Sequence, residues 1–240
     1  MLIAGVAVAA NAGMLFMNPI PQDPAYHAFA DRRAWFSVPN FWNVATNLPF
    51  LAVGVLGLAR LRRLAAAALR MHYIVFCVGV TLVASGSTYY HYAPSTPTLV
   101  WDRLPMTIAF MALFAAVFGD RISERAGHRL LWPLIALGIF SIAWWGFSEM
   151  DGRGDLRLYA LVQFLPMLLI PLMLVLLPGR ALHAAWLWAS LGAYIAAKVA
   201  EHFDGAILAA TGGFSGHSLK HLLAALGAWC AIRAFQAVPG

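Results

Sequence analysis

Charged side chains are scarce in this chain of 240 residues. Asp, Glu, Lys and Arg make up 11% of it and hydrophobic residues make up 62%, whereas a soluble globular domain carries about 25% charged residues. This balance excludes an ordinary soluble domain and predicts a polytopic membrane protein. The length allows seven or eight spans of ~20 residues with short loops, which we interpret as one membrane domain, residues 1–240.

Cysteine is also scarce, and nucleic-acid-binding motifs and internal repeats are absent. The two cysteines, Cys77 and Cys230, fall inside apolar segments, where packed free thiols are expected. The formal net charge is +6. In a membrane protein, basic residues mainly set orientation and contact lipid headgroups, so this charge does not predict a nucleic acid partner.

Apolar windows recur along the chain after residue 41 and predict the membrane spans. The expected core, residues 42–236, contains seven spans, at residues 42–59, 71–92, 104–119, 130–148, 158–177, 183–203 and 216–236. Residues 1–17 are an additional apolar segment, either a signal anchor or a cleaved signal peptide. Because the segment has no basic start, we favour a retained span, and its cleavage stays open. Residues 18–41 form a loop on the outer side. The predicted fold is therefore an all-α integral membrane protein, a seven-transmembrane-helix bundle plus an extra N-terminal hydrophobic helix.

Basic residues are divided unevenly between the two ends of these spans. One end carries two acids and the following arginines: Arg60, Arg62, Arg63, Arg70, Arg121, Arg125, Arg129, Arg180 and Arg233. The other end carries fewer basic residues and most of the acids. Because the side richer in Lys and Arg is cytoplasmic, we expect a cytoplasmic C-terminus. The opposite end would face the periplasm from a bacterial inner membrane.

Two histidines four residues apart, His217 and His221, open the last span. Four residues make about 1.1 helical turns, so both rings lie on one helix face and can share an ion. Polar groups of this kind within a membrane are costly and mark a functional hypothesis. His91 ends an earlier span at the same predicted depth. Three histidines from two helices match a catalytic zinc site, which leaves its fourth position for water.

Two further polar residues are predicted at this depth. Asp102 follows a short loop after His91 and can take a proton from water, and Ser87, one turn from His91, can stabilise an oxyanion. Simpler interpretations stay open: Asp102 as an ion pair with Arg103, His91 in an aromatic belt, and Ser87 as a small residue at a helix contact. Lys220 is expected to extend to the membrane surface.

The five polar residues form the pattern Ser87-x3-His91, then Asp102, then His217-x3-His221. This pattern resembles the alkaline ceramidase family, within the superfamily of seven-helix membrane hydrolases that includes adiponectin-receptor-like proteins. The stretch Phe41-Trp42-Asn43 resembles the opening of that family's first core span. The resemblance covers about residues 40–236 and points to a bacterial-type member.

The resemblance implies a role for each of these residues. Zinc would be held by His91, His217 and His221, while Asp102 would act as general acid and base and Ser87 would support the oxyanion. The implied reaction is hydrolysis of the ceramide amide to a sphingoid base and a fatty acid. The lipid would reach the site sideways, between helices, from the outer leaflet.

Eukaryotic members of that family bind calcium in an acid-rich N-terminal loop, with an acidic residue directly before Phe-Trp-Asn. Asn40 stands at that position here, and Asp31 is followed by two arginines. Calcium prefers six to eight oxygen ligands, several of them carboxylates. These features disfavour calcium near Asp31.

The predicted function is a zinc-dependent intramembrane lipid hydrolase that cleaves the amide of ceramide or a related N-acyl lipid taken from the bilayer. The alternative is a receptor-like or lipid-sensing membrane protein with a structural zinc site, closed by a fourth protein ligand. His202 is the candidate for that ligand; otherwise it joins Glu201 and Asp204 in an interfacial polar cluster. An ion-coupled transporter is disfavoured, because no corresponding pair of spans is broken by Gly or Pro. The acyl lipid, ester cleavage and the oligomeric state stay open.

Overall fold

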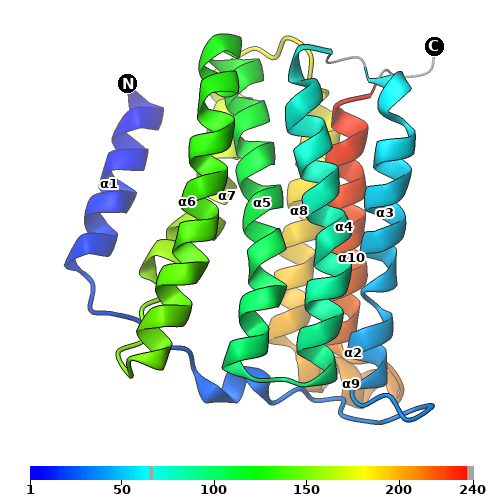
Figure 1. Ribbon diagram of the computed structural model, residues 1–240. Helices are drawn as coiled ribbons and strands as arrows, with labels where there is room; N and C mark the ends of the chain where they lie inside the picture. The colour runs from blue at the N-terminus through cyan, green and yellow to red at the C-terminus, as the bar shows by residue number, and fades with distance from the viewer. Residues whose placement is uncertain (65–66, 237–240) are drawn as a thin grey trace.

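The computed structural model describes residues 1–64 and 67–236, and over these residues the protein contains helices and no β-strand. The predicted domain, 1–240, thus includes six residues outside the described ranges. Long helices run side by side in one bundle (Figure 1). Their bounds are α3 (Leu48–Ala59), α4 (Arg70–Tyr92), α5 (Thr96–Arg121), α6 (Glu124–Met150), α7 (Arg157–Leu176), α8 (Ala184–His202) and α10 (Gly216–Ala234). Each predicted core span overlaps one of them.

Five helical segments are long and apolar enough to cross a membrane. They are Phe41–Ala59, which joins the short helix α2 (Phe41–Ala45) to α3, Ala67–Tyr92, Thr96–Arg121, Glu124–Met150 and Arg157–Leu176. The helices α8 and α10 have 19 residues each but are not among the five. Both carry charged or histidine residues near one end, which lowers their hydropathy. The helical bundle fits a membrane protein, and the count of seven spans stays a prediction.

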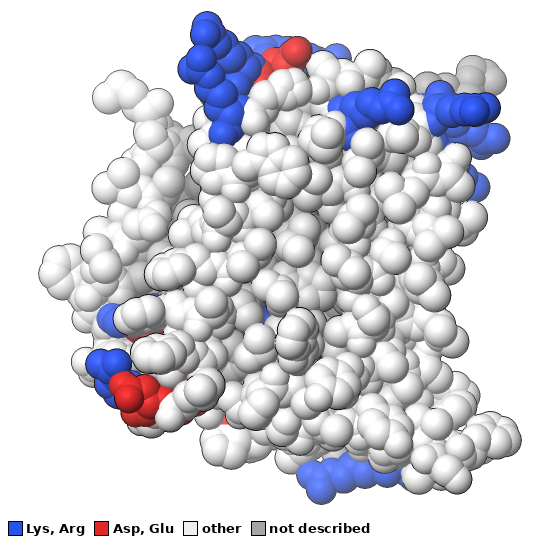
Figure 2. Space-filling model, viewed as in Figure 1, with Lys and Arg blue, Asp and Glu red and all other residues white. Residues whose placement is uncertain are grey.

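Charged side chains gather at the two ends of the bundle and leave an almost uncharged band between them (Figure 2). In this view, the end with the α3–α4 connection shows mostly Lys and Arg, whereas basic and acidic residues both appear at the other end. This division agrees with the uneven distribution seen in the sequence. The cytoplasmic location of the basic end stays a prediction.

The N-terminal helix α1 (Leu2–Phe16) lies beside α7 at the edge of the bundle (Figure 1). It has 15 residues and none of them is buried. A helix needs about 20 residues to cross a bilayer upright, so α1 is short for a span. The predicted extra hydrophobic helix is present, and none of its residues reaches the histidine cluster.

Helix α5 begins at Thr96, not at residue 104 as the hydropathy pattern predicted. Its start is fixed by a capping box in which the Ser95 hydroxyl accepts a hydrogen bond from Thr98 N (3.3 Å) and the Thr98 hydroxyl accepts one from Ser95 N (3.0 Å). The earlier start places Asp102 and Arg103 in the second turn of a helix. Their side-chain directions are therefore set by the helix and not by a loop.

Two glycines let helices approach closely where the polar residues lie. A side chain at Gly86 would collide with the backbone carbonyl of Trp101, and one at Gly216 would collide with that of Ala200. Only glycine fits such close approaches. The first contact joins α4 to α5 and the second joins α10 to α8. The residues that directly follow these four positions belong to the polar site described below; they are Ser87, Asp102, Glu201 and His217.

Candidate metal centre and active-site cavity

The structure brings the three predicted histidine ligands together. His91 lies in the last turn of α4, and His217 and His221 lie in the first turns of α10. All three are buried, and one ligand atom from each lies within 4.8 Å of the others. In the described part of the chain, this cluster contains no fourth His, Cys, Asp or Glu.

Each of these histidines has a buried ring nitrogen with no hydrogen-bond partner. The atoms are Nδ1 of His91, Nε2 of His217 and Nε2 of His221. Buried polar atoms are nearly always paired, because an unpaired one loses its hydration without compensation. A neutral imidazole nitrogen is a good metal ligand. The three residues therefore fit a metal ion.

The hydrogen bonds of Thr46 determine which nitrogen of His221 is free to bind a metal. The single hydroxyl hydrogen of Thr46 is donated to the Trp42 carbonyl (2.6 Å), so the same oxygen must accept from His221 Nδ1 (2.9 Å). His221 then carries its proton on Nδ1, and its unpartnered Nε2 presents a lone pair. Outer hydrogen bonds of this kind orient metal-binding histidines.

Replacing Thr46 with Val should weaken metal binding without removing a ligand. The substitution keeps the side-chain shape and removes the hydroxyl that accepts from His221 Nδ1–H, so we expect metal affinity to fall by about 10–100-fold. Competition with a chromogenic zinc chelator measures this. Thr46→Ser, which keeps the hydroxyl, is the control, and unchanged affinity in Thr46→Val would show that His221 needs no such partner.

The outer loop covers the histidine cluster. Phe29 is buried, and its ring centroid lies 4.8 Å from that of His91 and 4.6 Å from that of His217. The side chain of Asn40 donates to the His91 carbonyl (2.9 Å) from a left-handed backbone conformation, which Asn tolerates better than most residues. The cluster is therefore closed toward the side on which this loop lies.

The Phe-Trp-Asn stretch connects that loop to the histidine helix. Asn43 is fully buried; its side-chain nitrogen donates to the Asp31 carbonyl (3.3 Å), and its side-chain oxygen accepts from the Ser218 hydroxyl (2.8 Å). Asp204 makes a second connection: its carboxylate accepts from His217 N (2.7 Å) and Ala30 N (2.9 Å). These contacts hold the start of α10 in place.

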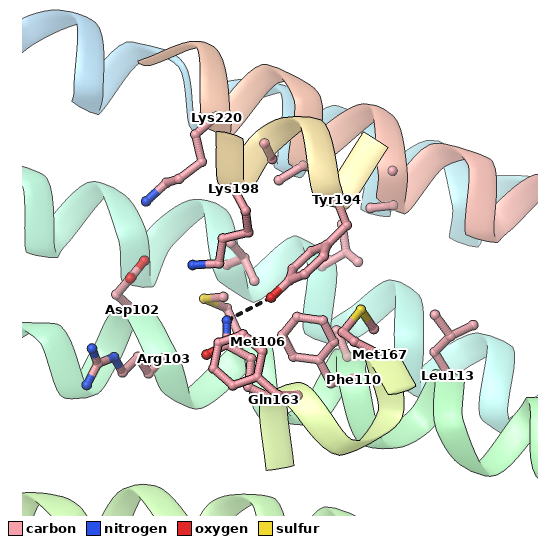
Figure 3. Close-up of a pocket in the computed structure, with 18 of the residues that line it drawn as sticks. Asp102, Arg103, Met106, Phe110, Leu113, Gln163, Met167, Tyr194, Lys198 and Lys220 are labelled. Carbon is pink, nitrogen blue, oxygen red and sulfur yellow. Dashed lines mark hydrogen bonds between the residues drawn. The ribbon is translucent and has the colours of Figure 1, made fainter. Parts of the chain in front are cut away.

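A cavity of about 450 Å³ adjoins the cluster between α4, α5, α7, α8 and α10. Ser87, Asp102 and His221 line its polar end, where the Ser87 hydroxyl lies close to the Asp102 carboxyl group. The rest of the wall is mostly apolar. Figure 3 shows Asp102, Arg103, Lys198 and Lys220 together at one end and Phe110, Leu113 and Met167 toward the other.

The interpretation of Asp102 and Arg103 as an ion pair does not hold. No such pair is present among the described residues, and the Arg103 guanidinium instead lies over the rings of Trp145, Tyr159 and Tyr26. Sequence reasoning missed these contacts because the rings come from three distant segments. The acidic side chain is left facing Ser87 and the cavity.

The prediction that Lys220 extends to the membrane surface is wrong. Its ammonium lines the cavity and donates to Glu201 (2.8 Å), which also accepts from Lys198 (2.7 Å). Glu201 therefore belongs to the cavity wall and not to an interfacial cluster. His202 is exposed, meets the Phe203 ring edge to face and is not part of the histidine cluster.

Asp31, in the loop of residues 18–41, forms a salt bridge with Arg33. Its two carboxylate oxygens accept from Arg33 Nε (2.9 Å) and Arg33 Nη2 (2.7 Å). These hydrogen bonds, opposed by burial, hold the pKa of Asp31 below its usual value. The carboxylate thus stays ionised and paired with arginine at neutral pH, which supports the expectation that calcium is not bound there.

Calcium should therefore not stabilise this protein. Addition of millimolar calcium to chelator-treated protein is expected to leave its melting temperature unchanged, because Asp31 pairs with Arg33 and belongs to no cluster of metal-ligating side chains among the described residues. Differential scanning fluorimetry measures this, with magnesium as the control ion. A rise in melting temperature specific to calcium, and lost in Asp31→Asn, would overturn the expectation.

These features define a helical bundle of the membrane type, in which a histidine cluster that could hold a metal ion meets the end of an apolar cavity. The chain matches the family model described as Ceramidase over residues 35–170, which is more than half of its length, and it belongs to that family. The resemblance to alkaline ceramidases is thus confirmed. The matched region includes Ser87, His91 and Asp102, whereas the histidines of α10 lie beyond it. No curated protein matches the chain.

Proposed function

We propose that the protein is a zinc-dependent hydrolase that cleaves the amide bond of ceramide or a related N-acyl lipid within the membrane. One observation carries the proposal: His221 of the metal-binding cluster, Asp102 and Ser87 line the polar end of an otherwise apolar cavity. Membership of the ceramidase family supports a lipid substrate and amide hydrolysis. The products would be a free fatty acid and an amine lipid.

The proposed chemistry assigns one role to each polar residue. Zinc held by His91, His217 and His221 would lower the pKa of a water molecule and polarise the substrate carbonyl. Asp102 accepts a proton from the attacking water and passes it to the leaving amine. Because a protonated Asp102 can itself donate to Ser87, the Ser87 hydroxyl is then free to donate its single hydrogen to the carbonyl oxygen as negative charge develops there.

The shape of the cavity favours a lipid that arrives from the bilayer. Its volume falls within the range of about 300–1,000 Å³ typical of small-molecule sites, and its apolar wall suits an acyl chain. Phe164 of α7 lines the cavity and is 49% exposed, so the cavity reaches the outer surface of the bundle at this helix. Because Phe29 covers the histidines, we propose that the lipid enters sideways beside α7.

The same proposal includes a location. We place the protein in a bacterial inner membrane with seven core spans, a cytoplasmic C-terminus and the site toward the periplasm. The uneven charge at the two ends supports this orientation. The substrate would then come from the outer leaflet.

A lipid sensor with a structural zinc site is the alternative. Structural zinc is usually held by four protein ligands, whereas catalytic zinc keeps one position open. The cluster contains three histidines in the described part of the chain, and His202 is exposed. The ligand count thus favours the hydrolase.

Lipid mass spectrometry tests the proposal. Purified zinc-loaded protein is incubated with a pool of N-acyl lipids, alongside the Asp102→Asn variant with its zinc content measured. We expect fatty acid release by the wild type alone. If both proteins leave every lipid unchanged, the sensor becomes the better account.

A further inference from the structure

Arg103 is a buried cation that forms no salt bridge with an acid in the described part of the chain. It is 7% exposed and lines the cavity, and its Nη1 is buried with no hydrogen-bond partner. Among the described residues, no carboxylate forms a salt bridge with it. A buried charge is costly unless something compensates for it. The buried charge of Arg103 in the cavity wall therefore indicates that a ligand with a negative charge binds there.

Three aromatic rings hold the guanidinium in place. The Arg103 Cζ atom lies 4.5 Å from the ring centroid of Trp145, 4.9 Å from that of Tyr159 and 5.3 Å from that of Tyr26. The rings come from α6, α7 and the 3-10 turn η1 (Pro24–His27). Cation–π contacts fix the position of the group without using its N–H donors. The planar guanidinium group of Arg103 is thus held in position to donate to a hydrogen-bond acceptor.

The other charges of the cavity do not supply that acceptor. Glu201 is shared by Lys198 and Lys220, at 2.7 Å and 2.8 Å. Among the described residues that line the cavity, the one other acid is Asp102, which faces Ser87. Three cations and two carboxylates therefore line the cavity before any metal binds. A neutral lipid would leave this positive excess uncompensated.

We propose that Arg103 binds a carboxylate on the amine part of the substrate, so that the preferred lipids are N-acyl amino acids and similar anionic N-acyl lipids. This inference rests on the proposed function and narrows its substrate class. The apolar part of the cavity takes the acyl chain, and Asp102 lies beside Arg103 at the polar end. The planar guanidinium fork matches the two oxygens of a carboxylate.

Binding of a matched ligand pair tests the inference without requiring turnover. The probes are the ketone isostere of N-palmitoylglycine, in which CH2 replaces the amide N–H, and the primary amide of that isostere. Neither probe contains the N-acyl amide bond that the enzyme would cleave, and they differ in the charge of the terminal group. We expect the zinc-loaded wild type to bind the anionic probe about tenfold tighter or more, as charge-assisted bidentate pairs do.

Three variants isolate the contribution of Arg103. Arg103→Met should bind both probes with the affinity that the wild type has for the neutral probe. Arg103→Lys should keep only part of the preference for the anionic probe, because lysine lacks the paired N–H donors of a guanidinium group. Arg153→Gln is the matched control, because Arg153 is exposed and pairs with Asp151; it should behave as the wild type. Equal binding of the two probes by the wild type, or a full preference in either Arg103 variant, would overturn the inference.

Turnover of the parent amides separates this inference from the proposed function. Hydrolysis of N-palmitoylglycine and its primary amide at equal rates, with no binding preference, would reject the role of Arg103 and leave the hydrolase intact. A binding preference without any hydrolysis would reject the hydrolase and leave the anion site intact.

Discussion

His217→Ala is expected to lose both the bound zinc and all measurable turnover. His217 is buried, and its unpartnered Nε2 is one of three ring nitrogens available to a metal. Removal of an outer hydrogen bond alone weakens metal binding by about 10–100-fold, so removal of a ligand should cost more. Elemental analysis of gently purified protein, together with fatty acid release, measures the two losses.

The control for this variant is His202→Ala. His202 also lies at the end of a helix beside the cluster, but it is exposed and meets the Phe203 ring edge to face. It should keep zinc and turnover. One zinc per chain in the His217→Ala protein would contradict the assignment of the three histidines.

Asp102→Asn is expected to keep zinc and lose turnover by about 10²–10⁴-fold, the usual contribution of general acid–base catalysis. The amide has nearly the same shape and can still accept the Ser87 hydrogen bond, but it cannot accept and return a proton. Asp102 is not a member of the histidine cluster, so the metal should remain. Zinc content and the rate of fatty acid release are measured on the same sample.

Asp151→Asn is the matched control, because Asp151 is an exposed carboxylate paired with Arg153. It should leave the rate unchanged. A comparable loss in Asp151→Asn would mean that net charge, and not proton transfer, determines the rate. Loss of zinc in Asp102→Asn would make Asp102 part of the metal site instead.

Local sequence patterns predicted the helices and the histidine cluster for simple reasons. Each apolar window overlaps one long helix of the described chain, and the four-residue spacing of His217 and His221 placed both rings on one face. The start of α5 was missed because hydropathy says little about helix ends. The capping pair Ser95 and Thr98 is visible in the sequence and was the signal that could have located it.

Contacts between distant segments could not be predicted in this way. Thr46 meets His221 across 175 positions of sequence, and Phe29 reaches the histidines from an irregular loop. Lys220 was misassigned because lysines near helix ends commonly extend to the surface. The packing of α8 against α10 gives it Glu201 as a partner instead.

Hydrolysis in ¹⁸O-labelled water tests the central claim most directly. Zinc-loaded wild-type protein is incubated with an N-acyl lipid in the labelled solvent, and the released fatty acid is analysed by mass spectrometry. Attack of water on the amide carbonyl predicts one ¹⁸O atom in the carboxyl group of the fatty acid and none in the amine product. Absence of fatty acid, or fatty acid without the label, would contradict the account.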